Sequence, residues 1–223
     1  MNNLVAVIPV RKGSERVNNK NFRSFANENL LIKKIKILKK IKSLDKIIIN
    51  TDSDKAIKIA KSYNLDFHKR EDYFASSSCP NSIFWKNVAE TTKSKHIMFA
   101  NCTSPLIKKK TIEDLIKIFK KKILTKKYDS INTVCAMKEF LFFKNKPMNF
   151  KNNKTPNSQD LPDIVKLNFA ISILSTKDMS KNKSLVGKKP YLFALNEVEG
   201  FDIDSKFEFN FAEYLYKKIN KNG

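Results

Sequence analysis

The feature that most constrains this chain is an apolar run near its start that ends in a basic loop. Residues 4–10, LVAVIPV, are continuously apolar, which is typical of a strand buried on both faces of a parallel sheet. The loop at residues 11–21 carries four cations, one glycine and several small polar side chains. Ligands of open α/β sheets bind beyond the carboxyl ends of the strands. A basic loop at that edge is suited to holding a triphosphate through main-chain N–H groups and cationic side chains.

The loop does not match either of two common phosphate-binding signatures. It lacks the Gly-Lys-Ser/Thr ending of a Walker A loop, and it has no GxGxxG pattern. On spacing alone, an ordinary basic surface loop is as good an interpretation as a triphosphate site. Features elsewhere in the sequence are needed to distinguish a surface loop from a triphosphate site.

Apolar periodicity alternates between strand-like and helix-like segments along most of the chain. The expected strands cover residues 4–10, 46–50, 66–68, 96–100, 130–136, 168–174 and 191–195, and the expected helices cover residues 30–41, 53–63, 81–91, 111–122 and 207–219. The second helix is expected to be capped by Thr51 or Asp52, and Phe84, Trp85 and Val88 of the third are expected in the core. This alternation predicts an α/β fold with a doubly wound, mostly parallel sheet and right-handed crossovers.

One segment breaks this alternation. Between residues 138 and 161 the periodicity fails, and Asn, Lys and Pro accumulate. Four phenylalanines in this segment are expected to be buried, which favours an excursion from the sheet over a linker: Phe140, Phe142, Phe143 and Phe150. The length suits a single domain, 1–223, with an insertion at residues 138–165.

The formal charge of +22 invites a nucleic-acid interpretation. However, only four of the 44 cations are arginines, and the lysines alternate with isoleucine in the predicted helices. A solvated helix face explains this pattern more simply than a nucleic-acid footprint, so a nucleic-acid partner is not expected. In either case the electrostatic field favours anionic ligands such as nucleotides and acidic sugars.

Cysteine spacing and hydropathy indicate the cellular compartment to expect for this chain. Cys79, Cys102 and Cys135 are widely spaced and form no CxxC pair, which argues for a reducing compartment and against a zinc site or a disulfide framework. The sequence has no signal-like apolar region and no apolar span of about 18 residues. We therefore expect a cytoplasmic protein with no membrane partner.

Two carboxylates near the end of the chain suggest a metal. In an extended Asp202-Ile203-Asp204 run both carboxylates point to one face, and Ile203 packs on the other. Adjacent carboxylates repel each other unless a cation binds between them, so the pair suggests a metal site. From the residues alone, a helix-capping role for Asp204 is an equal alternative.

Five segments, in order along the chain, are similar to signatures of the acylneuraminate cytidylyltransferase family, which makes CMP-sialic acids. They are Arg11-x-Gly-Ser-x-Arg-x-x-x-Lys-Asn21, Asn50-Thr-Asp-Ser53, Thr103-Ser-Pro-Leu106, Gln159-Asp-Leu-Pro162 with Asn168-Phe-Ala-Ile171, and Asp202-Ile-Asp204 with Ala212-Glu213. The resemblance implies a Rossmann-like nucleotidyltransferase that transfers CMP from CTP to an acidic acceptor and releases pyrophosphate. It also implies a homodimer whose subunits exchange contacts through the insertion.

The resemblance assigns roles to individual residues. The expected nucleotide-binding residues are Arg11, Gly13, Ser14, Lys20, Asn21, Arg70 and Ser82, and the expected acceptor-binding residues are Asn101, Gln159, Lys166, Asn168 and Phe169. Asp202 and Asp204 are the expected ligands of a Mg²⁺ or Mn²⁺ cofactor, and Arg11, Lys20 and Asp204 are the expected catalytic residues. Asp52 would lie at the same edge of the sheet, where capping the next helix is an equally good role.

The acceptor half of the pattern departs from the family. The differing positions are Asn101 for Gln, Cys102 for Pro, Ile107 for Arg, Ser158 for Arg, Lys166 for Arg and Phe169 for Gly. The missing arginines would bind the carboxylate of the acceptor bidentately, and lysine does not replace that fork. The nucleotide half is therefore retained, and the acceptor pocket is rebuilt.

Two classes of function remain. The first is a cytidylyltransferase for a nonulosonic acid such as sialic, legionaminic or pseudaminic acid, with Kdo, another acidic sugar or a phosphonate as variants. The second is a non-catalytic basic relative that binds a nucleotide or nucleic acid. Retention of Arg11, Lys20, Asp202 and Asp204 together favours the enzyme.

Overall fold

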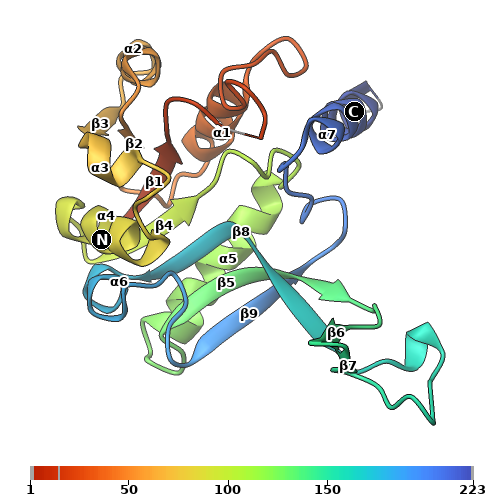
Figure 1. Ribbon diagram of the computed structural model, residues 1–223. Coiled ribbons are helices and arrows are strands. Elements are labelled where there is room, and N and C mark those ends of the chain that lie inside the picture. Colours follow the sequence, from red (N-terminus) through yellow and green to blue (C-terminus); the bar gives the residue numbers. More distant parts are fainter. Residues whose placement is uncertain (1–2, 15, 222–223) are drawn as a thin grey trace.

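A seven-stranded sheet forms the centre of the computed structural model, which describes residues 3–14 and 16–221 (Figure 1). Its strands are β1 (Leu4–Val10), β2 (Lys46–Thr51), β3 (Asp66–Lys69), β4 (His96–Ala100), β5 (Ser130–Met137), β8 (Ile164–Ser175) and β9 (Pro190–Leu195). They lie in the order β3-β2-β1-β4-β8-β5-β9. Only β8 runs against its neighbours β4 and β5, so the expected mostly parallel sheet is confirmed.

Helices cover both faces of the sheet, as a doubly wound fold requires (Figure 1). They are α1 (Leu30–Lys39), α2 (Asp54–Ser62), α3 (Asp72–Ala75), α4 (Asn81–Thr91), α5 (Lys109–Ile118), α6 (Thr176–Asn182) and α7 (Lys206–Lys221), with a π turn at Phe119–Ile123 and a 3₁₀ turn at Ser158–Asp160. One core cluster joins α1, α2, α5 and α7 to the sheet, and a second joins α4 and α6 to its other face. None of the helices in the described ranges has the length and apolarity needed to cross a membrane.

Strand β1 shows why its sequence has no polar alternation. Leu4, Ala6 and Ile8 belong to the core cluster on one face of the sheet, whereas Val5 and Val7 belong to the cluster on the other. All five are buried. A strand between two helix layers has no solvent face, so every position is apolar.

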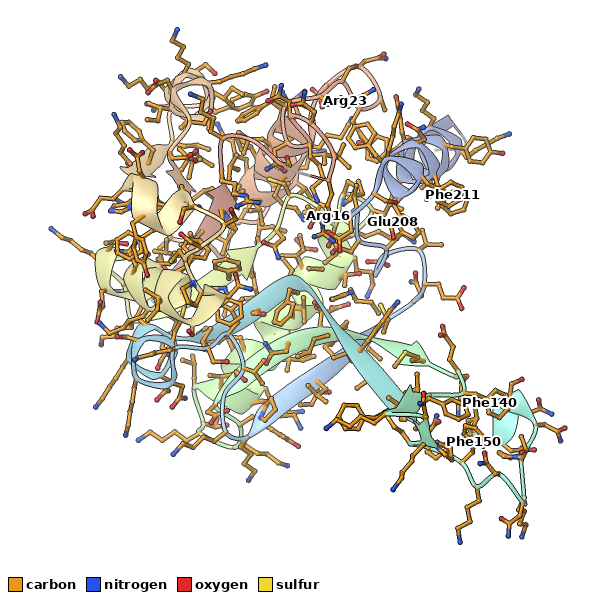
Figure 2. The ribbon with its side chains drawn as sticks, viewed as in Figure 1. Arg16, Arg23, Phe140, Phe150, Glu208 and Phe211 are labelled. Atoms are coloured by element: carbon orange, nitrogen blue, oxygen red, sulfur yellow. The ribbon has the colours of Figure 1, made fainter. Side chains whose placement is uncertain are left out.

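The segment between β5 and β8 leaves the sheet and forms a projecting arm, residues 138–163, at the lower right of Figure 1. It contains a short hairpin of β6 (Phe142–Phe143) and β7 (Lys146–Pro147). The expectation that its phenylalanines are buried is wrong, because Phe142 and Phe143 are 57% and 62% exposed. Phe140 and Phe150 contact each other within the arm (Figure 2), which has no sheet beneath it to bury the other rings.

Candidate active site

The carboxyl ends of the parallel strands surround a cavity of about 280 Å³. Arg11 and Asn21 reach it from the ends of the basic loop after β1, and Arg70 reaches it from the residue after β3. Asn101 follows β4, and Phe169 lies within the antiparallel strand β8. The structure therefore brings five of the predicted site residues, from distant segments of the chain, to one cavity.

The basic loop is folded by its own small polar residues and by Asp52. The Ser14 hydroxyl accepts a hydrogen bond from the Lys20 main-chain N–H at 3.1 Å, and Gly13 takes a left-handed φ of +72°. Asp52 Oδ1 accepts from the Lys12 main-chain N–H at 2.7 Å. The expectation that Thr51 or Asp52 caps α2 is wrong, because the Ser53 hydroxyl caps it and Asp52 braces the loop.

Lys20 connects this loop to the two aspartates near the end of the chain. Its buried ammonium donates to the Ile203 carbonyl oxygen and lies 3.6 Å from Asp204 Oδ1. Arg16 Nη2 lies 2.8 Å from the same Asp204 oxygen. Burial lowers the pKa of Lys20, although the charges of Asp204 and Asp202 oppose that shift. The loop and the two aspartates thus form one charged cluster.

Asp202 and Asp204 fit a hard cation. Burial raises the pKa of Asp202 in spite of a hydrogen bond from Thr103, and the nearby Asp204 charge adds to the shift. Asp202 Oδ1 is a buried oxygen with no hydrogen-bond partner, and the neighbouring Asp204 already attracts two cationic side chains. The described part of the chain has no cluster of three or more potential metal-binding residues among His, Cys, Asp and Glu. A Mg²⁺ ion here would take one or two carboxylates, and phosphate oxygens and water would complete its octahedron.

The capping alternative for Asp204 is not what the structure shows. Helix α7 begins with a capping box, in which Ser205 Oγ accepts from the Glu208 N–H at 3.2 Å. The Glu208 carboxylate in turn accepts from the N–H groups of Asp204 and Ser205 at 2.8 and 2.6 Å. Figure 2 labels Arg16 and Glu208 near this point, where the chain enters α7. The Asp204 carboxylate is therefore not needed for the cap.

Arg70 lies buried at the wall of the cavity. Its Nε and Nη2 donate to Asn50 Oδ1 and to the Asn50 carbonyl oxygen, at 2.8 and 2.9 Å. Its guanidinium lies 4.3 Å from the ring centroid of Phe84. Burial lowers the pKa of Arg70 to about 10, with Arg11 adding to the shift and Asp52 opposing it. Ser82, in the first turn of α4, does not line the cavity, whereas its neighbour Asn81 does.

The predicted acceptor residues separate into two groups. Asn101 Nδ2 donates to the Phe169 carbonyl oxygen at 2.9 Å, and the Phe169 ring lies 6.0 Å from that of Trp85. The neighbouring Asn168 is buried, and its amide bonds to the Thr133 hydroxyl and to the Gly200 carbonyl oxygen. The structure does not bring Gln159 and Lys166 to the cavity of their own chain, since both are exposed, Gln159 within the arm and Lys166 where β8 returns from it.

Sequence reasoning missed several residues around this site. Phe84 and Trp85 were expected in the core, but they are half-buried and line the cavity. Lys34 of α1 is fully buried, and its ammonium donates to the Ser104 carbonyl oxygen at 3.0 Å. Helical spacing would have revealed Lys34, because it lies midway between the core residues Leu30 and Leu38 at intervals of four.

Comparison with known proteins agrees with this geometry. The family model described as cytidylyltransferase matches residues 5–216. The post-translational flagellin modification protein B of Campylobacter coli is 26% identical over 99% of this chain and 97% of its own length. The N-acylneuraminate cytidylyltransferase of Escherichia coli is 25% identical over 98% of this chain, which spans 53% of that relative.

A similar fold is found in a solved structure of CMP:2-keto-3-deoxy-manno-octonic acid synthetase complexed with CTP. It superimposes with a TM-score of 0.70 at 12% identity and covers 96% of this chain and 98% of its own. At that identity the likeness concerns the fold alone. The fold, the signature loop and the family match lead to one conclusion: the chain belongs to the cytidylyltransferase family and is of the acylneuraminate type.

Proposed function

We propose that this cytidylyltransferase transfers CMP from CTP to a sialic-acid-like nonulosonic acid and releases pyrophosphate. The observation that carries the proposal is the cluster in which Lys20 joins the basic loop to Asp202 and Asp204. Nucleotidyl transfer needs an acceptor oxygen in line with the α-phosphorus and neutralisation of the charge on the leaving pyrophosphate. A basic loop facing two carboxylates supplies both kinds of charge that this reaction uses.

The individual roles follow from this arrangement. Arg11 and Lys20 would bind the phosphates of CTP, with Ser14 and Gly13 shaping the loop around them. Arg70 would bind the nucleotide through the N–H groups that Asn50 does not use. Asp202 and Asp204 would hold Mg²⁺ or Mn²⁺, which when bound neutralises charge on the phosphoryl oxygens. Ser82 remains a predicted nucleotide contact, next to Asn81, which lines the cavity.

The acceptor is proposed to lie against Asn101 and Phe169, since both line the cavity. Asn168 would act by fixing the backbone next to Phe169, because its side chain is already engaged. A chain with Phe169 in place of Gly, and with Ile107, Ser158 and Lys166 where the resembled family has arginines, differs from one that binds N-acetylneuraminic acid. We therefore expect N-acetylneuraminic acid itself to be a poor acceptor.

The remaining acceptor residues, Gln159 and Lys166, are proposed to serve a second copy of the chain. The arm that carries Gln159 projects from the body (Figure 1). It exposes Phe142, Phe143 and Met148. Aromatic side chains exposed together on a projecting segment are typical of a protein–protein contact. A homodimer that covers the arm would bring these residues toward the partner subunit.

The direct test measures pyrophosphate release for each NTP against a panel of α-keto acid sugars and phosphonates, with and without EDTA. The expected result is release from CTP alone, dependent on Mg²⁺ or Mn²⁺, with a nonulosonic acid as the best acceptor. Equal release from ATP, or full activity in EDTA, would contradict the proposal. Kdo or a phosphonate as the best acceptor would reassign the substrate, and N-acetylneuraminic acid as the best would refute a remodelled pocket. CTP binding without release for any acceptor would support the non-catalytic alternative.

A further inference from the structure

Asn50, near the end of β2, links Arg70 to a histidine outside the candidate active site. Its Oδ1 accepts from Arg70 Nε at 2.8 Å, and its carbonyl oxygen accepts from Arg70 Nη2 at 2.9 Å. Its Nδ2 lies 3.1 Å from Nδ1 of His68, which is its register partner on β3. The three side chains form one hydrogen-bonded chain across the edge of the sheet.

The donors and acceptors of Arg70 and Asn50 fix the protonation state of His68. A guanidinium only donates, so the amide oxygen of Asn50 must face Arg70 and its NH₂ group must face His68. Because that NH₂ group also only donates, Nδ1 of His68 must accept. His68 is therefore neutral with its proton on Nε2. Protonation of Nδ1 would place two donors against each other and break the chain at that point.

We propose that His68 and Asn50 are positioning residues that orient the Arg70 guanidinium for the nucleotide, and that protonation of His68 releases this restraint. The proposal rests on the proposed function, because it takes the cavity beside Arg70 to be the CTP site. Of the five N–H groups of a guanidinium, Asn50 takes two, which leaves three for a ligand. The buried Arg70 also stacks on Phe84, so its orientation has little freedom once Asn50 is fixed.

The charges around His68 favour its neutral form. Burial lowers the pKa of His68, the Arg70 charge lowers it further, and Glu71 opposes both. On the side away from the active site, His68 lines a groove of about 440 Å³ that Lys46, Asp66 and Lys93 also line. Lys46 and Asp66 form an ion pair at 2.6 Å in that groove. Since the folded pKa lies below the ordinary value of about 6.5, CTP affinity is expected to fall only in mildly acidic solution.

The first experiment reads the histidine directly and does not depend on nucleotide binding. Long-range ¹H–¹⁵N NMR of the whole protein reports the tautomer and the pKa of His68, and His96→Gln removes the only other histidine for assignment. The expected result is the Nε2–H tautomer, titrating below 6.5. An Nδ1–H tautomer at neutral pH, or an unshifted pKa, would overturn the proposal.

The second experiment measures CTP affinity by calorimetry at pH 8 and pH 5.5 for the wild type, His68→Gln, His68→Leu and His96→Gln. His68→Leu removes the acceptor for Asn50 and should weaken binding about 3- to 10-fold at pH 8. In His68→Gln an amide oxygen replaces the ring nitrogen as acceptor and does not titrate. This variant should therefore bind CTP more tightly than His68→Leu at pH 8, and it should not show the wild-type loss of affinity at pH 5.5. His96→Gln should lose affinity at pH 5.5 as the wild type does.

The outcomes separate the two ideas. If His68→Leu binds CTP as tightly as the wild type at pH 8, the positioning role is overturned and the proposed function still stands. If His68→Gln loses as much CTP affinity at pH 5.5 as the wild type does, the release by protonation of His68 is overturned, and the proposed function again stands. If the wild type binds no CTP at pH 8, the proposed function fails, and the positioning role is overturned with it, whatever tautomer NMR reports.

Discussion

Phe169 is the residue at which side-chain size and backbone conformation conflict most. Its φ of +51° lies in the left-handed region, and it is the one aromatic residue with a positive φ among those described. Bulky residues are rare there, and the strain costs about 1–3 kcal/mol. The surroundings hold this conformation, because Asn101 binds the Phe169 carbonyl oxygen and the Asn168 amide oxygen accepts from the Ala170 N–H. Strain of this kind at a cavity wall suggests that the ring serves the ligand.

A pair of substitutions isolates this strain. Phe169→Ala and Phe169→Gly both remove the ring, but only glycine adopts the positive φ freely. We expect Phe169→Gly to be more stable than Phe169→Ala by about 1 kcal/mol in urea unfolding. At Ser172, an ordinary position of the same strand, alanine should instead be the more stable of the two. The same order at both positions would contradict a strained Phe169.

Asp204 allows catalysis to be separated from helix stability. Asp204→Asn removes a proposed metal ligand and should lower turnover at least ~10²-fold, because transition-state charge is no longer neutralised. Asp202→Asn should act in the same direction. Since Ser205 and Glu208 cap α7, Asp204→Asn should keep the helix cap, and its melting temperature should fall only through the weakened ion pairs with Lys20 and Arg16.

Ser205→Ala is the matched control for Asp204→Asn. It should lower stability by about 1 kcal/mol through loss of the cap, with a smaller effect on turnover. Unchanged turnover together with a lower melting temperature in Asp204→Asn would restore the capping role for that aspartate.

At the scale of the element, α1 carries a charge into the core. Lys34 is fully buried between the sheet and the loop after β4, and burial lowers its pKa to about 8. A lysine whose folded pKa lies below its unfolded pKa of 10.5 destabilises the fold most below pH 8. Between pH 8 and pH 10.5 the unfolded chain binds more protons than the folded chain, so the free energy of unfolding rises with pH.

Lys34→Met tests this element. The variant lacks the buried charge. The difference in free energy of unfolding, variant minus wild type, should therefore be greatest near neutral pH and should fall by about 3 kcal/mol by pH 10.5. Urea unfolding at pH 7.5, 9 and 10.5 measures the difference. Lys40→Met, at an exposed lysine that ends the same helix, controls for loss of one positive charge. A difference in free energy of unfolding that does not vary with pH would contradict a lowered pKa of Lys34.

Elements with strong periodicity were predictable, and elements defined by long-range pairing were not. Apolar runs and helical spacing placed β1, β4 and α4 within a residue or two, because burial on a fixed face dictates those patterns. The direction of β8 depends on its connection through the arm, which carries no periodic signal. Sequence motifs assigned Lys20 and Asp204 to one site, and the structure has them 3.6 Å apart. The motifs could not show that Glu208 rather than Asp204 serves the cap.

At the scale of the whole molecule, the exposed aromatic side chains are unevenly distributed. Phe140, Phe142 and Phe143 are exposed on the arm, and Phe207 and Phe211 are exposed on α7. Figure 2 labels Phe140 on the arm and Phe211 on α7. Phe140 and Phe142 both pack edge-on against Phe150, so these three rings pack together within the arm. Phe142 and Phe143 expose more surface and are the better candidates for contact with a second copy.

The whole-molecule prediction concerns assembly. Light scattering should give the wild type the mass of two 25.8 kDa chains, and Phe142→Ser with Phe143→Ser should give the mass of one. Because both rings are mostly exposed in the single chain, the variant should keep its circular dichroism spectrum. Phe207→Ser, at a residue 77% exposed on α7, is the matched control and should remain dimeric. If Gln159 and Lys166 serve the partner subunit, the monomeric variant should show a higher KM for the acceptor and a similar KM for CTP. A monomeric wild type, or a dimer that survives both substitutions, would leave the arm without this role.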